Sequence, residues 1–190
     1  MTKWAAIVPL KAAGDRKTRL SDRLSAEERA ALSQHMFAHV VKALESHPGI
    51  ASVTVLSDQR PSGWTGMWIA DEGRGLNAEL ESARTRFTGS GVLVLHADLP
   101  LLELIDIDVL IGAAEARGIA IAPDRHGSGT NALALLPHAQ IAFRFGPDSF
   151  WLHREQAPDA MIVERQGLRL DLDTPDDLAA AEAAGFRPGG

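Results

Sequence analysis

The chain has 190 residues, of which 45% are apolar and 23% charged, a composition typical of one globular domain rather than of a disordered chain. The formal net charge of −6 and the lack of a basic tail argue against a nucleic-acid partner, and no apolar run is long enough to cross a bilayer. Cysteine is absent, which excludes disulfides, thiolate metal sites and a cysteine nucleophile and leads us to expect a cytoplasmic protein with no membrane partner.

The first half of the chain alternates short apolar runs with helical patterns. Strands are predicted over residues 4–10, 50–58, 66–72 and 91–98, and the last of these, GVLVLHAD, is the most apolar. After the first loop, Ser25 is the predicted N-cap of a helix, with Glu28 completing a capping box and Pro48-Gly49 ending the helix. A second helix is predicted over 75–87.

The second half continues this alternation. Helices are predicted over 105–118 and 149–157, and strands over 119–124, 130–137 and 160–166. A last helix starts after Thr174 as N-cap, with Pro175 in its first turn. The order predicts an α/β fold: a three-layer α/β/α domain with a mostly parallel sheet over residues 1–186, and a disordered tail at 187–190. Ligands of such sheets bind beyond the carboxyl ends of the strands, where we expect the chemistry.

Acidic residues gather at those strand ends. Asp98 follows the most apolar strand, so its carboxylate is expected at the ligand edge, where a second carboxylate beside it would suit Mg²⁺. Asp173 is the expected partner; Asp171 is the alternative ligand, and Asp173 alternatively serves only as an anion at a helix N-terminus. The other acidic residues near predicted strand or helix ends are Asp58, Asp124 and Asp176, and we interpret Asp58 and Asp176 as turn or cap residues.

A basic cluster follows the first strand of this otherwise acidic chain. It comprises Lys11, Arg16, Lys17, Arg19 and Arg23. Its position at the first strand's carboxyl end favours a cradle for a polyphosphate, although a solvated charged loop is the alternative. Neither the Walker A pattern nor G-x-G-x-x-G occurs there, which argues against a P-loop and against a Rossmann dinucleotide site.

Seven stretches in order carry a family resemblance: VPLKAAGDRKTRL, SAEERAAL, GLNAEL, VLVLHADLPLL, IAPDRHGSGTNALAL, FRFGPDSFWLH and LDLDTPDDL. Together they resemble the phospholactate guanylyltransferase family of coenzyme F420 biosynthesis, within the GT-A-like nucleotidyltransferases, from about residue 5 to residue 180. The related molybdenum cofactor guanylyltransferases carry a glycine-rich first loop that this chain lacks. The resemblance implies transfer of GMP from GTP to the phosphate of phosphoenolpyruvate, 2-phospho-L-lactate or 3-phospho-D-glycerate, with release of pyrophosphate.

The resemblance also implies a role for each matching residue. It gives Lys11, Lys17 and Arg19 to the nucleotide phosphates, Asp98 and Asp173 to Mg²⁺, Gly75 and Asn77 to the guanine or ribose, and Thr130, Gly146 and Ser149 to the acceptor. Lys17, Arg19 and Asp98 would form the catalytic set. Asn77 and Ser149 have an alternative explanation as ordinary helix N-caps.

The GSGTNAL stretch, residues 127–133, is typical of an anion-binding loop or of a hairpin turn. Because the basic loop already accounts for the nucleotide phosphates, the resemblance places this stretch on one wall of the acceptor pocket. Asp148 departs from the family pattern, and an acid there would repel the acceptor unless it points outward or pairs with Arg144.

Other functions and assemblies stay open at this point. A nucleotidyltransferase with another nucleotide or a sugar phosphate, and a nucleotide-binding module without turnover, are both compatible with the fold. A homodimer is also open, with an exposed Trp64–Trp68 segment as its candidate contact surface.

Overall fold

The computed structural model describes residues 2–10 and 17–188. Lys11 and Arg16 therefore lie outside the described residues. The strands are β1 (Trp4–Pro9), β2 (Ile50–Ser57), β3 (Met67–Ala70), β4 (Gly91–Leu95), β5 (Ile119–Pro123), β6 (Thr130–Leu135) and β7 (Met161–Ile162). The helices are α1 (Ala26–Ser46), α2 (Leu76–Arg84), α3 (Leu104–Arg117), α4 (Ser149–Gln156), α5 (Gln166–Arg169) and α6 (Pro175–Ala183), with short 3₁₀ turns at Thr18–Leu20 and Thr85–Phe87. In this part of the chain no helix has the length and apolar character needed to span a membrane.

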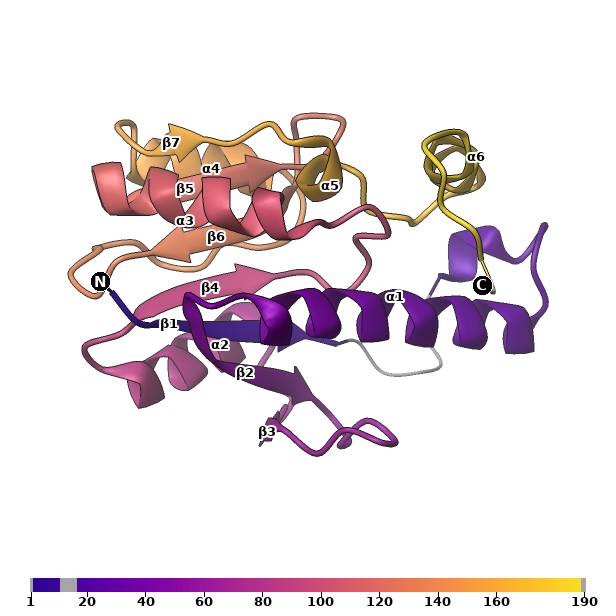
Figure 1. The fold of residues 1–190 in the computed structure, drawn as a ribbon, viewed down its shortest axis with the longest axis horizontal. Helices are drawn as coiled ribbons and strands as arrows, with labels where there is room; N and C mark the ends of the chain where they lie inside the picture. Colours follow the sequence, from indigo (N-terminus) through magenta and orange to yellow (C-terminus); the bar gives the residue numbers. More distant parts are fainter. Residues whose placement is uncertain (1, 11–16, 189–190) are drawn as a thin grey trace.

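The described strands form one sheet in the order β3-β2-β1-β4-β6-β5-β7 (Figure 1). Neighbouring strands are parallel except at β6, which runs antiparallel to both β4 and β5. The mostly parallel sheet is thus confirmed. Because β6 is reversed, its first residues lie at the same edge as the carboxyl ends of the other strands.

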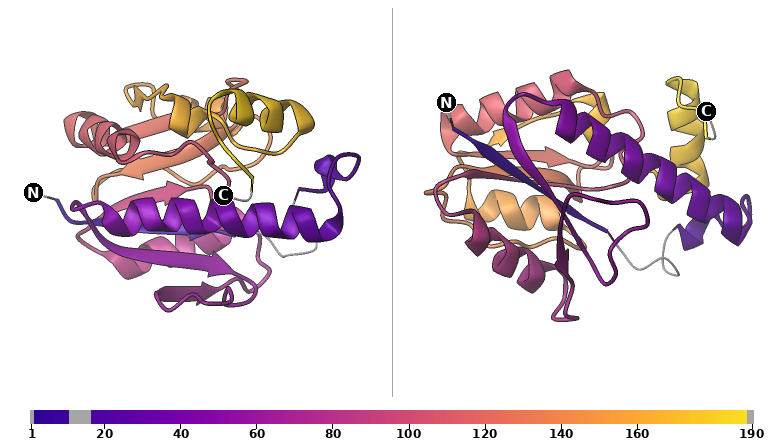
Figure 2. Two further views of the ribbon diagram at one scale, coloured as in Figure 1. Left: turned by 45° about the vertical axis from the view of Figure 1, so that its right-hand side comes forward. Right: turned by 60° about the horizontal axis from the view of Figure 1, so that its bottom comes forward.

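Helices cover both faces of the sheet, which confirms the three layers (Figures 1 and 2). Side chains of α1, α3 and α5 pack on one face, and side chains of α2 and α4 pack on the other. The last helix, α6, stands apart from the sheet beside the start of α1, where Leu32 and Met36 share a small apolar cluster with Leu172 and Ala181.

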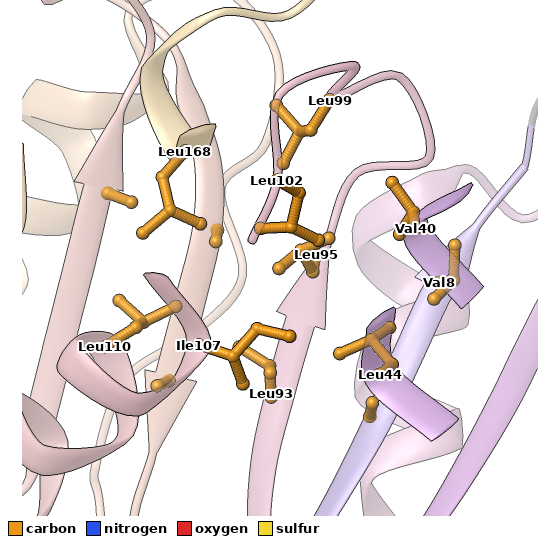
Figure 3. Close-up of a cluster of buried hydrophobic side chains, with 14 of the residues drawn as sticks. Val8, Val40, Leu44, Leu93, Leu95, Leu99, Leu102, Ile107, Leu110 and Leu168 are labelled. Carbon is orange, nitrogen blue, oxygen red and sulfur yellow. The ribbon is translucent and has the colours of Figure 1, made fainter. Parts of the chain in front are cut away.

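The position of β4 in the middle of the sheet explains why its sequence is continuously apolar. Leu93 and Leu95 point to the α1 and α3 side, where they meet Leu44 and Ile107 (Figure 3). Val92 and Val94 point the opposite way, into the cluster on the other face. All four are buried, since a strand covered on both faces exposes neither set of side chains to water.

Local signals fix the helix starts as expected. Ser25 Oγ accepts the Glu28 N–H at 3.2 Å while Glu28 Oε2 accepts the Ser25 N–H at 2.8 Å, and Thr174 caps α6. Helix α3 begins at Leu104, one residue before the expected start, and the cap formed there by Glu103 and Asp106 was not predicted.

The two indoles of the Trp64–Trp68 segment are less exposed than we expected. Both are half-buried: the Trp64 ring packs against Phe37 with 6.2 Å between centroids, and the Trp68 Nε1 donates to Ser57 Oγ at 3.1 Å. Met67, between them, is 50% exposed, and a role of the segment in a homodimer stays a prediction.

An ion pair between exposed Arg74 and buried Glu79 holds the loop between β3 and α2. The Glu79 carboxylate is enclosed, and Arg74 contacts it through Nε at 3.1 Å and NH2 at 2.7 Å. The backbone N–H groups of Glu72 and Arg74 donate to the same carboxylate. The Arg74 hydrogen bonds, with these N–H groups, lower the Glu79 pKa from its ordinary value to about 2.

This pair makes an acid-dependent contribution to stability. Because the folded-state pKa lies below the ordinary value, the contribution is complete above about pH 4.5 and is lost as pH falls toward 2. We expect Glu79→Gln to lower the thermal midpoint most at pH 6 and progressively less toward pH 3. Glu45→Gln, an exposed site on α1, is the matched control and should show no such trend. A midpoint difference independent of pH would contradict the assignment.

Candidate active site

A cleft of about 620 Å³ opens at the sheet edge where the carboxyl ends of the parallel strands meet the start of β6. Its walls come from segments far apart in the sequence. Among the residues that line it are Leu10, Lys17, Thr18, Arg19, Asp71, His96, Asp98, Asp124, Thr130, Asn131, Phe145, Gly146, Ser149, Asp171 and Asp173. The position agrees with the expectation for ligands of such sheets.

Lys17 joins the two carboxylates expected to bind metal. Its Nζ lies 2.6 Å from Asp98 Oδ2 and 2.7 Å from Asp173 Oδ1. Burial alone would lower the Lys17 pKa, but the charges and hydrogen bonds of the two aspartates outweigh it, so the pKa is raised above its ordinary value. Lys17 also has a left-handed backbone, with φ 56°, a conformation that non-glycine residues rarely adopt.

The Asp98 and Asp173 carboxylates therefore converge on one point, which the positively charged Lys17 ammonium occupies. Asp98 comes from the loop after β4 and Asp173 from the segment before α6, so the two residues are far apart in the sequence. Within the described ranges no group of three or more His, Cys, Asp or Glu side chains converges as a metal cage. Two carboxylates fit Mg²⁺, which completes its coordination with substrate phosphates and water rather than with a full protein cage.

Asp171 lines the same cleft but is hydrogen-bonded by Asn131. Asn131 Nδ2 donates to Asp171 Oδ1 at 3.1 Å, and also to the carbonyls of Leu168 and Arg169 at 3.0 and 3.1 Å. Burial and the nearby Asp98 charge raise the Asp171 pKa to about 6. The geometry thus favours Asp173 over Asp171 as the partner of Asp98.

The helix-terminal anion beside Asp173 is a different residue, Asp177. Asp177 Oδ2 accepts the backbone N–H of Asp173 at 3.1 Å and that of Thr174 at 2.7 Å. Arg125 Nε lies 2.7 Å from Asp177 Oδ1. Asp177 therefore caps α6 and fixes the backbone that presents Asp173, a role that sequence analysis missed although its spacing from Thr174 is that of a capping box.

The GSGTNAL stretch is both a hairpin turn and a wall of the cleft. Asp124 orders the turn: its carboxylate accepts the Ser128 N–H at 2.9 Å, and its backbone N–H donates to Gly129 O at 3.0 Å. The pairing between β5 and β6 then slips by one residue, since Ala122 pairs with Ala132 but Pro123 pairs with Thr130. The bulge leaves Asn131 as the extra residue.

This bulge reverses the side chains at the start of β6. Thr130 points to the α4 face and Asn131 to the α5 face, the opposite of what strict alternation from Ala132 would give. Thr130, Gly146 and Ser149 all line the same part of the cleft. Their contact with an acceptor stays a prediction.

Asn77 contacts protein backbone. Its Oδ1 accepts the Phe145 N–H at 2.7 Å and its Nδ2 donates to Phe145 O at 3.0 Å, while Gly75 is the N-cap residue of α2 with φ 92°. Leu76, between them, lines the cleft. Asn77 thus fixes the strand-like segment that carries Phe145 and Gly146; its predicted contact with the nucleotide is untested.

Asp148 does not line the cleft. The residue is exposed and occupies the N-cap position of α4 with a left-handed backbone, φ 56°. An acid here was expected to repel the acceptor unless it pointed outward or paired with Arg144. Asp148 is exposed to solvent, and no ion pair joins it to Arg144 within the described residues.

Comparison with known proteins decides the family. The family model described as "Guanylyl transferase CofC like" matches residues 4–182, nearly the whole chain. The chain belongs to this family. The chain is 40% identical over 201 residues to the phosphoenolpyruvate guanylyltransferase of Rubrobacter xylanophilus, covering 96% of this chain and 97% of the relative. The enzyme of that name from Sphaerobacter thermophilus is 36% identical, covering 97% and 94%.

Solved structures show the same fold at low identity. A Desulfovibrio desulfuricans protein described as a nucleotide-diphospho-sugar transferase superposes with a TM-score of 0.75 at 18% identity, covering 94% of the guanylyltransferase chain and 85% of its own. A CMP:2-keto-3-deoxy-manno-octonic acid synthetase complexed with CTP gives 0.61 at 13% identity, covering 96% and 98%. These neighbours show that the chain shares its overall α/β fold with them.

Proposed function

We propose that the guanylyltransferase transfers GMP from GTP to the phosphate of a small phosphorylated carboxylic acid in coenzyme F420 biosynthesis. Phosphoenolpyruvate is the first candidate acceptor, and 2-phospho-L-lactate and 3-phospho-D-glycerate are the others. One observation carries the proposal: a buried lysine and two carboxylates converge at the sheet edge, opposite a wall of small and hydroxyl residues. The names of the relatives support the choice of acceptor.

The reaction needs little covalent help from the protein. An oxygen of the acceptor phosphate attacks the α-phosphorus of GTP, a new P–O bond forms, and the bond to the β-phosphate breaks so that pyrophosphate leaves with its electron pair. The acceptor phosphate is already ionised at neutral pH, so no base is required. Catalysis then consists of positioning and charge neutralisation.

The cations of the first loop would neutralise the nucleotide phosphates. Lys17 and Arg19 line the cleft, and Lys17 already lies beside the carboxylate pair. Asp98 and Asp173 would hold Mg²⁺, which when bound supplies charge to the phosphates and orients the α-phosphate. We expect Lys17 then to exchange its carboxylate contacts for phosphate contacts. Lys11 would assist from the same loop.

The opposite wall would hold the acceptor. Thr130 and Ser149 present hydroxyl groups, and Gly146 adds no side chain that would obstruct an approaching phosphate or carboxylate. The Ser149 backbone lies at the N-terminal end of α4, where the helix dipole favours an anion.

Product analysis tests this function directly. Purified protein is incubated with GTP, Mg²⁺ and each acceptor, pyrophosphate is measured, and products are identified by mass spectrometry. We expect a product whose mass equals GTP plus phosphoenolpyruvate minus pyrophosphate, formed with GTP in preference to ATP, CTP and UTP. Chelation of the metal should stop turnover, and added Mg²⁺ should restore it.

Three outcomes would overturn the proposal. No pyrophosphate from GTP with any of the three acceptors would exclude this reaction. Preferential turnover of another nucleotide would assign the protein to a different nucleotidyl transfer, and tight GTP binding without product would indicate a nucleotide-binding module.

A further inference from the structure

His153 lies directly behind the acceptor wall and is completely buried. It belongs to α4, one turn after Ser149, and its ring packs edge-on against Phe145 with 5.0 Å between ring centroids. Both ring nitrogens are engaged: Nδ1 lies 3.0 Å from Thr130 Oγ1, and Nε2 lies 2.9 Å from the Arg144 backbone nitrogen. The ring is therefore held by packing and by two hydrogen bonds.

These contacts assign the tautomer of the ring. A backbone N–H can only donate, so His153 Nε2 must be the unprotonated nitrogen that accepts from Arg144. Burial lowers the His153 pKa to about 4, which keeps the ring neutral at physiological pH. The single ring proton is then on Nδ1, and Nδ1–H donates to Thr130 Oγ1.

The direction of that hydrogen bond constrains Thr130. Its hydroxyl accepts from His153, so the hydroxyl proton must be donated elsewhere. Thr130 is 2% exposed and lines the cleft, and within the described residues its hydroxyl has no partner other than His153. The remaining direction for the proton is the cleft.

We propose that His153 is a positioning residue that directs the Thr130 hydroxyl proton into the cleft, so that the hydroxyl donates a hydrogen bond to the acceptor. This wall would then favour an ionised oxygen, such as that of a phosphate or carboxylate. The inference rests on the proposed function, in which Thr130 contacts the phospho-acid.

Two isosteric variants separate the contacts of the ring. Asparagine places an amide nitrogen near the Nδ1 position, so His153→Asn keeps a donor to Thr130 and loses the acceptor for Arg144. Glutamine places an amide oxygen near the Nε2 position, so His153→Gln keeps the Arg144 contact and loses the donor to Thr130. Steady-state KM values for phosphoenolpyruvate and for GTP, together with thermal midpoints, are measured for both.

We expect the two measurements to rank the variants in opposite orders. His153→Gln should raise the acceptor KM about tenfold, with the GTP KM unchanged and a midpoint near that of the wild type. His153→Asn should have the lower midpoint but an acceptor KM close to the wild-type value. In a Thr130→Val background, His153→Gln should raise the acceptor KM no further, because both changes act through one hydroxyl.

The possible failures are distinct. If wild-type protein turns over phosphoenolpyruvate but His153→Gln leaves its KM unchanged, or raises both KM values equally, the positioning role is wrong while the function stands. Additive effects with Thr130→Val would also overturn it. If the wild-type protein uses none of the acceptors, the proposed function fails, and this inference fails with it.

Discussion

Asp98→Asn is expected to reduce the rate of pyrophosphate release at least about a thousandfold, with the fold retained. The substitution removes the negative charge from one of the two carboxylates that converge on the cation position beside Lys17. In the proposed function these carboxylates would hold Mg²⁺. The charge that such a metal ion supplies contributes several kcal/mol to stabilising the transition state, so weakening its site should have an effect of this size. Rates are measured with GTP and phosphoenolpyruvate at saturating Mg²⁺.

Asp58→Asn is the matched control for this change. Asp58 also follows a strand of the sheet, at the end of β2, but it is exposed and does not line the cleft. It should retain the wild-type rate. Full activity in Asp98→Asn, or an equal loss in both variants, would remove Asp98 from the proposed metal site.

Gly167→Ala is expected to lower the free energy of unfolding by roughly 3 kcal/mol, as overpacking of a closed site does. A Cβ at this position in α5 would overlap Asp106 Oδ2 and would lie 2.5 Å from the Leu101 carbonyl oxygen. Asp106 cannot move aside freely, because it is buried, accepts Arg165 Nε at 2.8 Å and caps α3 through the Glu103 N–H. The measurement is urea-induced unfolding at equilibrium.

Gly112→Ala provides the contrast. Gly112 is an exposed residue inside α3, and a Cβ there would meet no atom within 4 Å. Alanine has the higher helix propensity, so this variant should gain roughly 0.5–1 kcal/mol. If Gly167→Ala had wild-type stability, Asp106 and Leu101 would have to move aside at little cost, which would contradict this prediction.

Much of the fold follows from patterns confined to short stretches. The Ser25 and Thr174 caps and the apolar strand at β4 each depend on neighbours within a few residues, and all three are confirmed. The reversal of β6 lacks such a signal, because a buried apolar strand has the same sequence pattern in either direction.

The sequence pointed to the residues of the candidate site but not to the contacts between them. Asp98, Asp173 and Lys17 were predicted from their places near strand and helix ends and from the family resemblance. Nothing in the sequence shows that Lys17 pairs with both aspartates, which lie 81 and 156 positions away. His153 was not predicted as a site residue because a single histidine on a short helix is typical of a packing residue. Its spacing of four from Ser149 places both on one helix face, which was the available clue.

The bulge at Asn131 lets the two ends of β6 follow different side-chain patterns. From Ala132 onward β6 keeps the alternation that fills the core, while Thr130 and Asn131 follow the opposite phase and reach α4 and α5. Asn131 secures the segment carrying Asp171 and Asp173, and in the proposed function Thr130 would contact the acceptor. If so, a substitution at position 130 would change the choice of acceptor without disturbing the segment that carries Asp171 and Asp173, although Thr130 and Asn131 are adjacent in the chain.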